Sequence, residues 1–176
     1  LTPKARRAKK QMIVLGGSMS GRAYLDPQPK FFEDFELGDV MTTRGRTVDI
    51  GDITNFAGLT GDHYQLHTDA RFMEGNRFGQ RIAHGPLTFS LAVGLVGLSG
   101  FYGDAIVALV EITGLKATAP VFAGDTLHVV ATVTEHVASG AKYGTLGVSY
   151  SVRNQDDAEV MTFLQTMLAK RRALEG

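Results

Sequence analysis

The predicted architecture depends most on the apolar stretch Pro86-Leu-Thr-Phe-Ser-Leu-Ala-Val-Gly-Leu-Val-Gly-Leu98. Its residues are apolar almost all the way round a helix, which predicts a buried helix rather than one lying on a surface. Pro86 suits the first helical turn, where the missing N–H of proline costs nothing. Gly100 and Gly103 flank the exit of this helix.

The segments on either side of this helix read mainly as strands. Upstream, residues 41–48 predict a strand and residues 49–61 a shorter helix with the apolar stripe Ile53, Phe56, Ala57 and Leu59. Asp49 and Asp52 favour the positive start of that helix, and Gly61 ends it. Strands are predicted downstream over residues 105–116, 126–137, 144–153 and 160–170, the last with a helix as the alternative.

Strands before and after a single buried helix predict an α+β architecture, in which a sheet wraps around the helix. The 176 residues are 44% apolar, which is enough for one domain with a core and short for two. Basic and acidic side chains balance at 18 each. The zero net charge argues against nucleic acid or an anionic membrane as the main partner and permits self-association.

The chain contains no cysteine. Disulfides, thiol nucleophiles and Cys-ligated metals are therefore excluded, and a cytoplasmic location is expected. No apolar run reaches the roughly 18 residues that a membrane span needs.

The first thirty residues differ in composition from the rest. They begin with a basic stretch, contain no acidic residue before Asp26, and include a Gly/Ser-rich segment at 16–21. We expect residues 1–30 to be an extension: an artificial leader, a docking arm onto another subunit, or the remnant of a targeting segment. The domain proper is expected to span residues 31–176.

The segment between the two helices concentrates groups that can carry chemistry. Asp62 and His67 lie five residues apart, which on a continuous helix would put them about 140° apart. They can share a substrate only if the chain bends, which Gly61 allows. Two structural roles stay open: Asp62 as a helix cap and His67 as a partner for a buried backbone group. A metal site on Asp62, His63 and His67 is a weaker alternative, because no second His/Glu cluster completes it.

A second feature is the His84-Gly85 step into the buried helix. Free N–H groups at a helix start point outward and favour negative charge. Gly85 lacks a side chain, so a ligand can approach its backbone closely. The simpler alternative is that Gly85 only makes a turn before Pro86.

Together these features resemble the MaoC-like dehydratase family, which includes the (R)-specific enoyl-CoA hydratases. The family signature is Asp-x-Asn-Pro-aliphatic-His, followed by a His-Gly step into the central helix. Here residues 56–62, His67 and residues 82–85 carry the resemblance, which extends over about 31–170. Two positions depart from the pattern: Tyr64-Gln65 replaces Asn-Pro, and Val93 stands where some family hydratases have serine.

The resemblance implies a hot-dog fold, a curved antiparallel sheet around one long central helix, in a homodimer or a multiple of dimers with the active site near the subunit interface. It implies an enzyme that adds water to, or removes it from, an enoyl or 3-hydroxyacyl thioester such as acyl-CoA. Coenzyme A would be part of the substrate, and no metal or other cofactor is expected.

The resemblance also implies roles for individual residues. Asp62 and His67 would hold the reacting water as an acid–base pair, and the Gly85 N–H would stabilise the thioester oxygen. A thioesterase on the same fold and a non-catalytic acyl-CoA-binding module are the alternatives. Three further residues are expected to contact the substrate: Tyr64, His84 and Val93.

Overall fold

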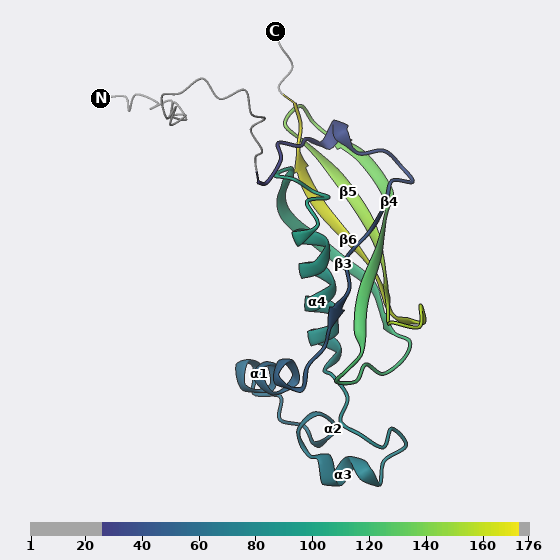
Figure 1. The fold of residues 1–176 in the computed structure, drawn as a ribbon. Helices are drawn as coiled ribbons and strands as arrows, with labels where there is room; N and C mark the ends of the chain where they lie inside the picture. Colours follow the sequence, from purple (N-terminus) through teal and green to yellow (C-terminus); the bar gives the residue numbers. More distant parts are fainter. Residues whose placement is uncertain (1–25, 173–176) are drawn as a thin grey trace, which may run out of the picture.

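One antiparallel sheet curves around one long helix in the computed structural model, which describes residues 26–172 (Figure 1). This confirms the α+β architecture expected from the sequence. The helical elements are η1 (Phe32–Asp34), α1 (Ile50–Thr60), α2 (Gln65–Thr68), α3 (Ala70–Glu74) and α4 (Gly85–Leu98). The strands are β1 (Val40–Thr42), β2 (Arg46–Thr47), β3 (Ile106–Ala117), β4 (Thr126–Ser139), β5 (Tyr143–Arg153) and β6 (Glu159–Lys170).

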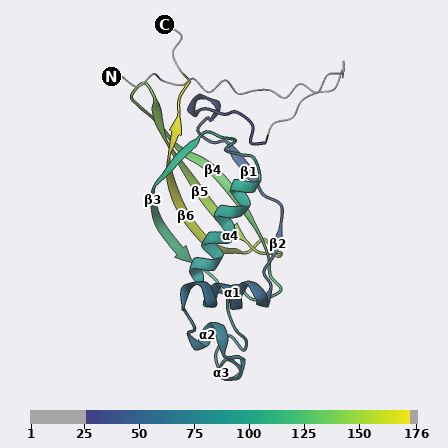
Figure 2. The ribbon, with the colours of Figure 1, turned by 90° about the vertical axis from the view of Figure 1, so that its left-hand side faces the viewer.

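Helix α4 is the predicted buried helix, and it lies across the sheet (Figure 2). Pro86 occupies its first turn, as predicted. The helix is not buried on all sides, because Ser90, Gly94 and Leu98, which lie four residues apart on one face, are exposed. Four of its buried side chains join the inward-facing residues of the sheet in one core, and they are Leu87, Ala92, Leu95 and Val96. Thr88 is also buried.

The sheet has the strand order β1-β4-β5-β6-β3, with β2 also pairing with β4. The strand predicted over residues 41–48 is therefore two short strands. Between them, Thr43 bonds Val129 with both its backbone N–H and its hydroxyl oxygen, each at 2.9 Å. At Gly45 a Cβ would lie only 2.9 Å from the Thr126 side chain, so the chain passes close to β4 there. These local contacts interrupt the regular ladder.

The last two predicted strands are confirmed, and β6 resolves the choice between strand and helix at residues 160–170. It lies between β5 and β3, and its alternate side chains, Met161, Phe163 and Met167, are buried. The sequence of residues 160–170 is compatible with both a strand and a helix, because apolar residues occur on both faces of β6. Its pairing with two neighbouring strands in the sheet makes it a strand.

Strand β3 forms one edge of the sheet. Its sequence is a largely apolar run, and most of its residues are exposed in the single chain. Four large apolar side chains on it are about half exposed: Val107, Leu109, Val110 and Leu115.

Helix α1 begins and ends as predicted. The Asp52 carboxylate accepts the Asp49 N–H at 2.9 Å, and Gly61 closes the helix in the left-handed region with φ of 77°. The apolar stripe is only partly confirmed, because Ile53 and Ala57 are buried whereas Leu59 is 83% exposed. Leu59 lies near the end of α1, beyond the residues that pack on the body.

The first 25 residues of the predicted extension lie outside the described part of the chain. Contacts with the body begin slightly before the predicted boundary at Phe31. The Asp104 N–H donates to the Gln28 carbonyl at 3.0 Å, and Lys30 Nζ donates to the Phe101 carbonyl at 2.7 Å. Within residues 26–172, no helix is long and apolar enough to cross a membrane.

Candidate active site

The polar residues singled out in the sequence meet at the end of the molecule where α1, α2 and the start of α4 come together (Figure 1). A ligand atom from each of Asp62, His67 and His84 lies within 4.8 Å of the other two. These three residues come from a loop, from α2 and from the position before α4, so tertiary packing builds the cluster.

Asp62 follows the bend at Gly61, in the non-helical stretch between α1 and α2. Its N–H is 3.2 Å from the Thr60 hydroxyl oxygen, and its Oδ1 accepts the Tyr64 N–H at 3.3 Å. The carboxylate is exposed in the single chain. Asp62 therefore caps the turn before α2 weakly, and it keeps oxygen lone pairs available for a ligand.

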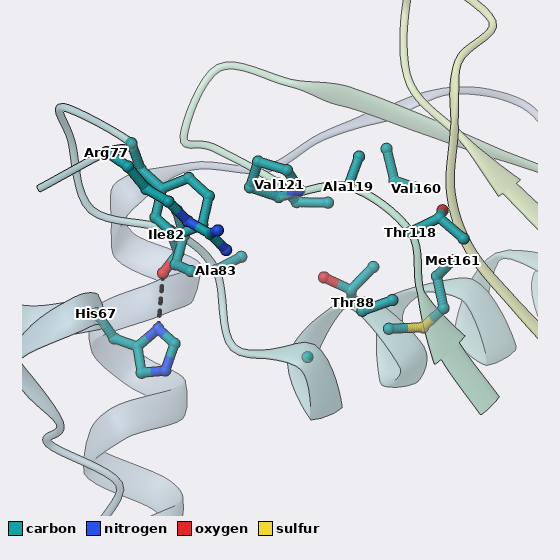
Figure 3. A pocket seen from close by; sticks show the side chains of 14 residues that line it. His67, Arg77, Ile82, Ala83, Thr88, Thr118, Ala119, Val121, Val160 and Met161 are labelled. Carbon is teal, nitrogen blue, oxygen red and sulfur yellow. Dashed lines mark hydrogen bonds between the residues drawn. The ribbon is translucent and has the colours of Figure 1, made fainter.

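His67 lies on α2 and is half-buried. Its Nδ1 is 2.8 Å from the Ile82 carbonyl oxygen (Figure 3). A carbonyl can only accept, so we assign the proton to Nδ1, which leaves Nε2 with the free lone pair. The predicted bond to a backbone group is thus present, and it leaves the second nitrogen able to exchange a proton.

His84 is completely buried, with 0% exposure. Its Nε2 donates to the Asp62 carbonyl at 2.9 Å, and its ring stacks on that of His67 with centroids 3.8 Å apart and an angle of 25° between the planes. Its Nδ1 is buried without a hydrogen-bond partner in the described structure. Because the two stacked rings are close to parallel, their in-plane lone pairs do not converge as metal coordination requires.

Gly85 is the first residue of α4 and lines a cavity of about 300 Å³ together with His67. Its N–H is one of those that a helix start leaves without an intrahelical acceptor. A Cβ at Gly85 would meet nothing within 4 Å, so packing does not require glycine there. The absent side chain instead leaves room beside the cavity.

The cavity is mainly apolar and is lined by segments from both halves of the chain (Figure 3). Arg77, Ile82 and Ala83 lie on the side of His67, whereas Thr88 and Met161 lie opposite. The sequence did not predict that the end of β3, the β3–β4 connection and β6 line this cavity, because contacts between segments distant in sequence produce no local pattern. The walls from these regions are Ala117, Thr118, Ala119, Pro120, Val121, Val160 and Met161.

Of the site residues predicted from the sequence, His67 and Gly85 line this cavity, whereas Asp62, Tyr64, His84 and Val93 are not among its lining residues. Tyr64 is 63% exposed, and Val93 is half-buried on α4. Neither lines the cavity, so their expected contacts with substrate stay predictions. His63 is exposed and does not join the cluster, where His84 takes its place beside Asp62 and His67.

A curved antiparallel sheet around a central helix, with a polar cluster at the start of that helix, defines a protein of the hot-dog fold class. The chain belongs to the MaoC-like domain family, because the family profile described as "MaoC like domain" matches residues 34–154.

Relatives of known sequence agree with this assignment. The chain is 34% identical to Protein MaoC of Klebsiella aerogenes over 113 residues, 64% of this chain but only 33% of that protein. It is 31% identical to the uncharacterized protein YdeM of Bacillus subtilis over 139 residues, 79% of this chain and 98% of that protein. An (R)-specific enoyl-CoA hydratase of Rhodospirillum rubrum is 32% identical over 104 residues, 59% of this chain and 69% of that enzyme.

Solved structures show the same fold. A monoamine oxidase regulatory protein from Archaeoglobus superposes with a TM-score of 0.79 and 32% identity, covering 84% of this chain and 99% of that one. A Mycobacterium tuberculosis protein with a double hot-dog fold superposes with a TM-score of 0.71 and 21% identity. That match covers 83% of this chain and 45% of the other, so the present chain corresponds to one of its two halves.

Proposed function

We propose that the protein catalyses the reversible addition of water to a 2-enoyl thioester, giving a 3-hydroxyacyl thioester, with an acyl-CoA as the substrate. The observation that carries this proposal is that Asp62 lies close to His67, which in turn lines one cavity together with Gly85. Hydratase names among the family relatives support the same reaction class.

The Asp62 carboxylate and His67 Nε2 are suited to hold one water molecule between them. Groups whose ligand atoms lie within 4.8 Å of one another can be bridged by a water at hydrogen-bond distances of about 2.8 Å. In the hydration direction, the water oxygen forms a bond to C3 and the C2–C3 π electrons move toward the thioester. The Asp62/His67 pair accepts one proton from the water and gives one proton to C2, so the pair returns to its starting protonation state.

The Gly85 N–H is suited to the negative charge that develops on the thioester oxygen as C3 is attacked. It lies at the positively polarised start of α4 and on the cavity wall. A donor aimed at a developing oxyanion is typically worth about 3 kcal/mol in the transition state. The thioester itself acidifies C2, so this route needs no metal or redox cofactor.

We propose that two copies of the chain associate through β3. This strand is a long edge with half-exposed apolar side chains, and such an edge is a ready template for another strand. The likeness to one half of a double hot-dog chain supports a second domain beside this one. Because β3 ends at Ala117 on the cavity wall, the interface would lie next to the site.

A panel of 2-enoyl-CoA esters of increasing chain length tests the proposed reaction. Hydration removes the absorbance of the conjugated thioester without releasing free thiol, and a thiol reagent in parallel samples measures any release. The proposal fails if thiol appears at the rate of absorbance loss, which indicates a thioesterase. Tight binding of the esters with neither signal indicates the binding module instead.

A further inference from the structure

His84 is the least accessible polar group of the cluster, and its contacts reach each of the groups that the proposed reaction uses. Its Nε2–H donates to the Asp62 carbonyl at 2.9 Å, and its ring stacks on His67 at 3.8 Å. Phe56 of α1 packs against the same ring at 5.1 Å. The next residue in the chain is Gly85.

The bond from His84 is the main long-range link that fixes the Asp62 backbone. Within its own segment, the Asp62 N–H has only the Thr60 hydroxyl at 3.2 Å, and the carboxylate has only the Tyr64 N–H at 3.3 Å. Both contacts are local, because they join Asp62 to residues two positions away in the sequence. The His84 contact instead joins that loop to α4 across 22 positions of sequence.

His84 is itself held firmly. Its carbonyl accepts the Thr88 N–H at 3.1 Å, which ties it to the first turn of α4, and its side chain has 0% exposure. A displacement of this ring therefore changes the spacing between Asp62, His67 and Gly85 together.

An imidazole is a costly side chain for this position. Its Nδ1 is buried without a partner, and an unpaired buried polar atom destabilises the fold. A phenyl ring would fill much of the same space and stack on His67 without that cost. We therefore explain the presence of an imidazole here by the hydrogen bond that its Nε2–H donates to the Asp62 carbonyl.

We propose that His84 is a positioning residue, whose Nε2–H bond to the Asp62 carbonyl sets the place of the Asp62 carboxylate relative to His67 and Gly85. This inference rests on the proposed hydratase function for its kinetic consequences. It does not require His84 to contact the substrate.

Three substitutions separate the N–H bond from the ring. His84→Phe keeps a stacking ring but removes the donor. His84→Gln places an amide N–H near the position of Nε2, whereas the shorter His84→Asn does not reach the Asp62 carbonyl. We expect kcat to fall about 10- to 100-fold in the Phe and Asn variants with KM changed less than threefold, because small misplacements of reacting groups are costly. The Gln variant should lose no more than about threefold.

His136 provides a matched control at the far end of the sheet. Its Nε2 also donates to a backbone carbonyl, that of Phe32 at 2.9 Å, and its ring stacks on the same residue at 3.7 Å. His136→Asn should leave kcat and KM unchanged. Melting temperatures of all four variants check that each is folded. If His84→Phe does not fold, the Gln and Asn pair alone decides the question.

The amide resonance of Tyr64 gives a readout independent of turnover, because Asp62 Oδ1 accepts that N–H. We expect it to shift in His84→Asn and to stay close to its wild-type position in His84→Gln. An inactive wild-type protein overturns the proposed function, while the Tyr64 resonance still tests the positioning. Equal kcat in the Gln and Asn variants, or an unmoved Tyr64 resonance in His84→Asn, overturns the role of His84.

Discussion

The imidazole rings of His67 and His84 stack with their centroids 3.8 Å apart, although one residue lies on α2 and the other precedes α4. Each ring also bonds a backbone carbonyl of the other's neighbourhood, His67 that of Ile82 and His84 that of Asp62. These contacts hold α2 against the segment that precedes α4, and they bring the carboxylate of Asp62 close to both rings.

We predict that Asp62 and His67 behave as one acid–base unit. Asp62→Asn keeps the size but cannot accept a proton, and His67→Ala removes the partner. Each should lower kcat by about 10²–10⁴-fold. The double mutant should be little worse than either single mutant, because residues that act as a unit are not additive. Steady-state hydration rates measure this.

The exposed His63 is the control for that series, and His63→Ala should retain full turnover. Melting curves distinguish a structural role, which would lower stability while leaving near-normal turnover in the folded fraction. Single mutants that keep more than half of the wild-type kcat would show that the site is wrongly assigned.

We predict that Gly85→Ala separates activity from stability. A Cβ there meets nothing within 4 Å, so the fold should accept it with an unchanged or slightly raised melting temperature. The methyl group would project beside the cavity and displace the thioester, lowering kcat/KM by about 10- to 100-fold. Gly94→Ala, at another glycine of α4 with open space, should leave kcat/KM unaltered. Equal kinetics for the two variants would contradict the role of Gly85.

We predict that Val110→Lys disrupts self-association. Val110 is 59% exposed on the β3 edge, and two lysines brought together by pairing of two β3 strands would repel each other. Light scattering at micromolar concentration should give a dimer or a multiple of dimers for the wild type and a smaller mass for the variant. Leu37→Lys changes an equally exposed apolar residue away from β3 and should not alter the mass. A strictly monomeric wild type would refute the interface.

We predict that Val93 influences the choice of acyl chain rather than the chemistry. It lies eight residues beyond Gly85 on α4, a distance of about 12 Å along the helix axis. Only longer chains reach that far from the thioester. Val93→Ser should therefore change kcat/KM for long enoyl esters and leave the four-carbon ester almost unaffected. An unchanged chain-length profile would argue against any contact with Val93.

We predict that Glu33 stabilises the fold above about pH 4.5. The hydrogen bond from the Arg171 side chain, followed by that from the Arg172 N–H, lowers the pKa of Glu33 from 4.5 to about 2. A depressed pKa in the folded state means that this stability is present above pH 4.5 and is lost as the pH falls toward 2. Glu33→Gln should lower the melting temperature at pH 7, and the difference from wild type should shrink across that window.

Glu36→Gln, at an exposed carboxyl whose side chain makes no ion pair in the described structure, is the control for Glu33 and should leave the melting temperature at pH 7 close to that of the wild type. A constant difference between Glu33→Gln and wild type from pH 7 to pH 2 would contradict the ion-pair explanation.

Several local features were predictable because neighbours in sequence decide them. The start of α1 at Asp49, its end at Gly61, and Pro86 in the first turn of α4 each depend on residues within one helical turn. Asp62 and His67 could be singled out for the same reason, since a short segment holds both.

Other features needed the tertiary structure. The identity of β6 as a strand depends on β5 and β3 at its sides, and the exposure of β3 on its place at the sheet edge. An apolar run such as that of β3 occurs both in strands buried inside a sheet and in strands at a sheet edge. Hydrophobicity indicates that a strand buries apolar surface, but it does not identify the segment or subunit that packs on it.

A bend at Gly61 and a helix start at Gly85 could be predicted from neighbouring residues, because backbone geometry and free N–H groups are local properties. That Asp62, which follows the bend, lies beside His84, which precedes the helix, depends on the packing of segments distant in sequence. The bonds of His67 to Ile82 and of His84 to Asp62 end on carbonyl oxygens, which every residue type carries. No side-chain pattern marks such an acceptor, so packing of α1, α2 and α4 had to bring donor and carbonyl together.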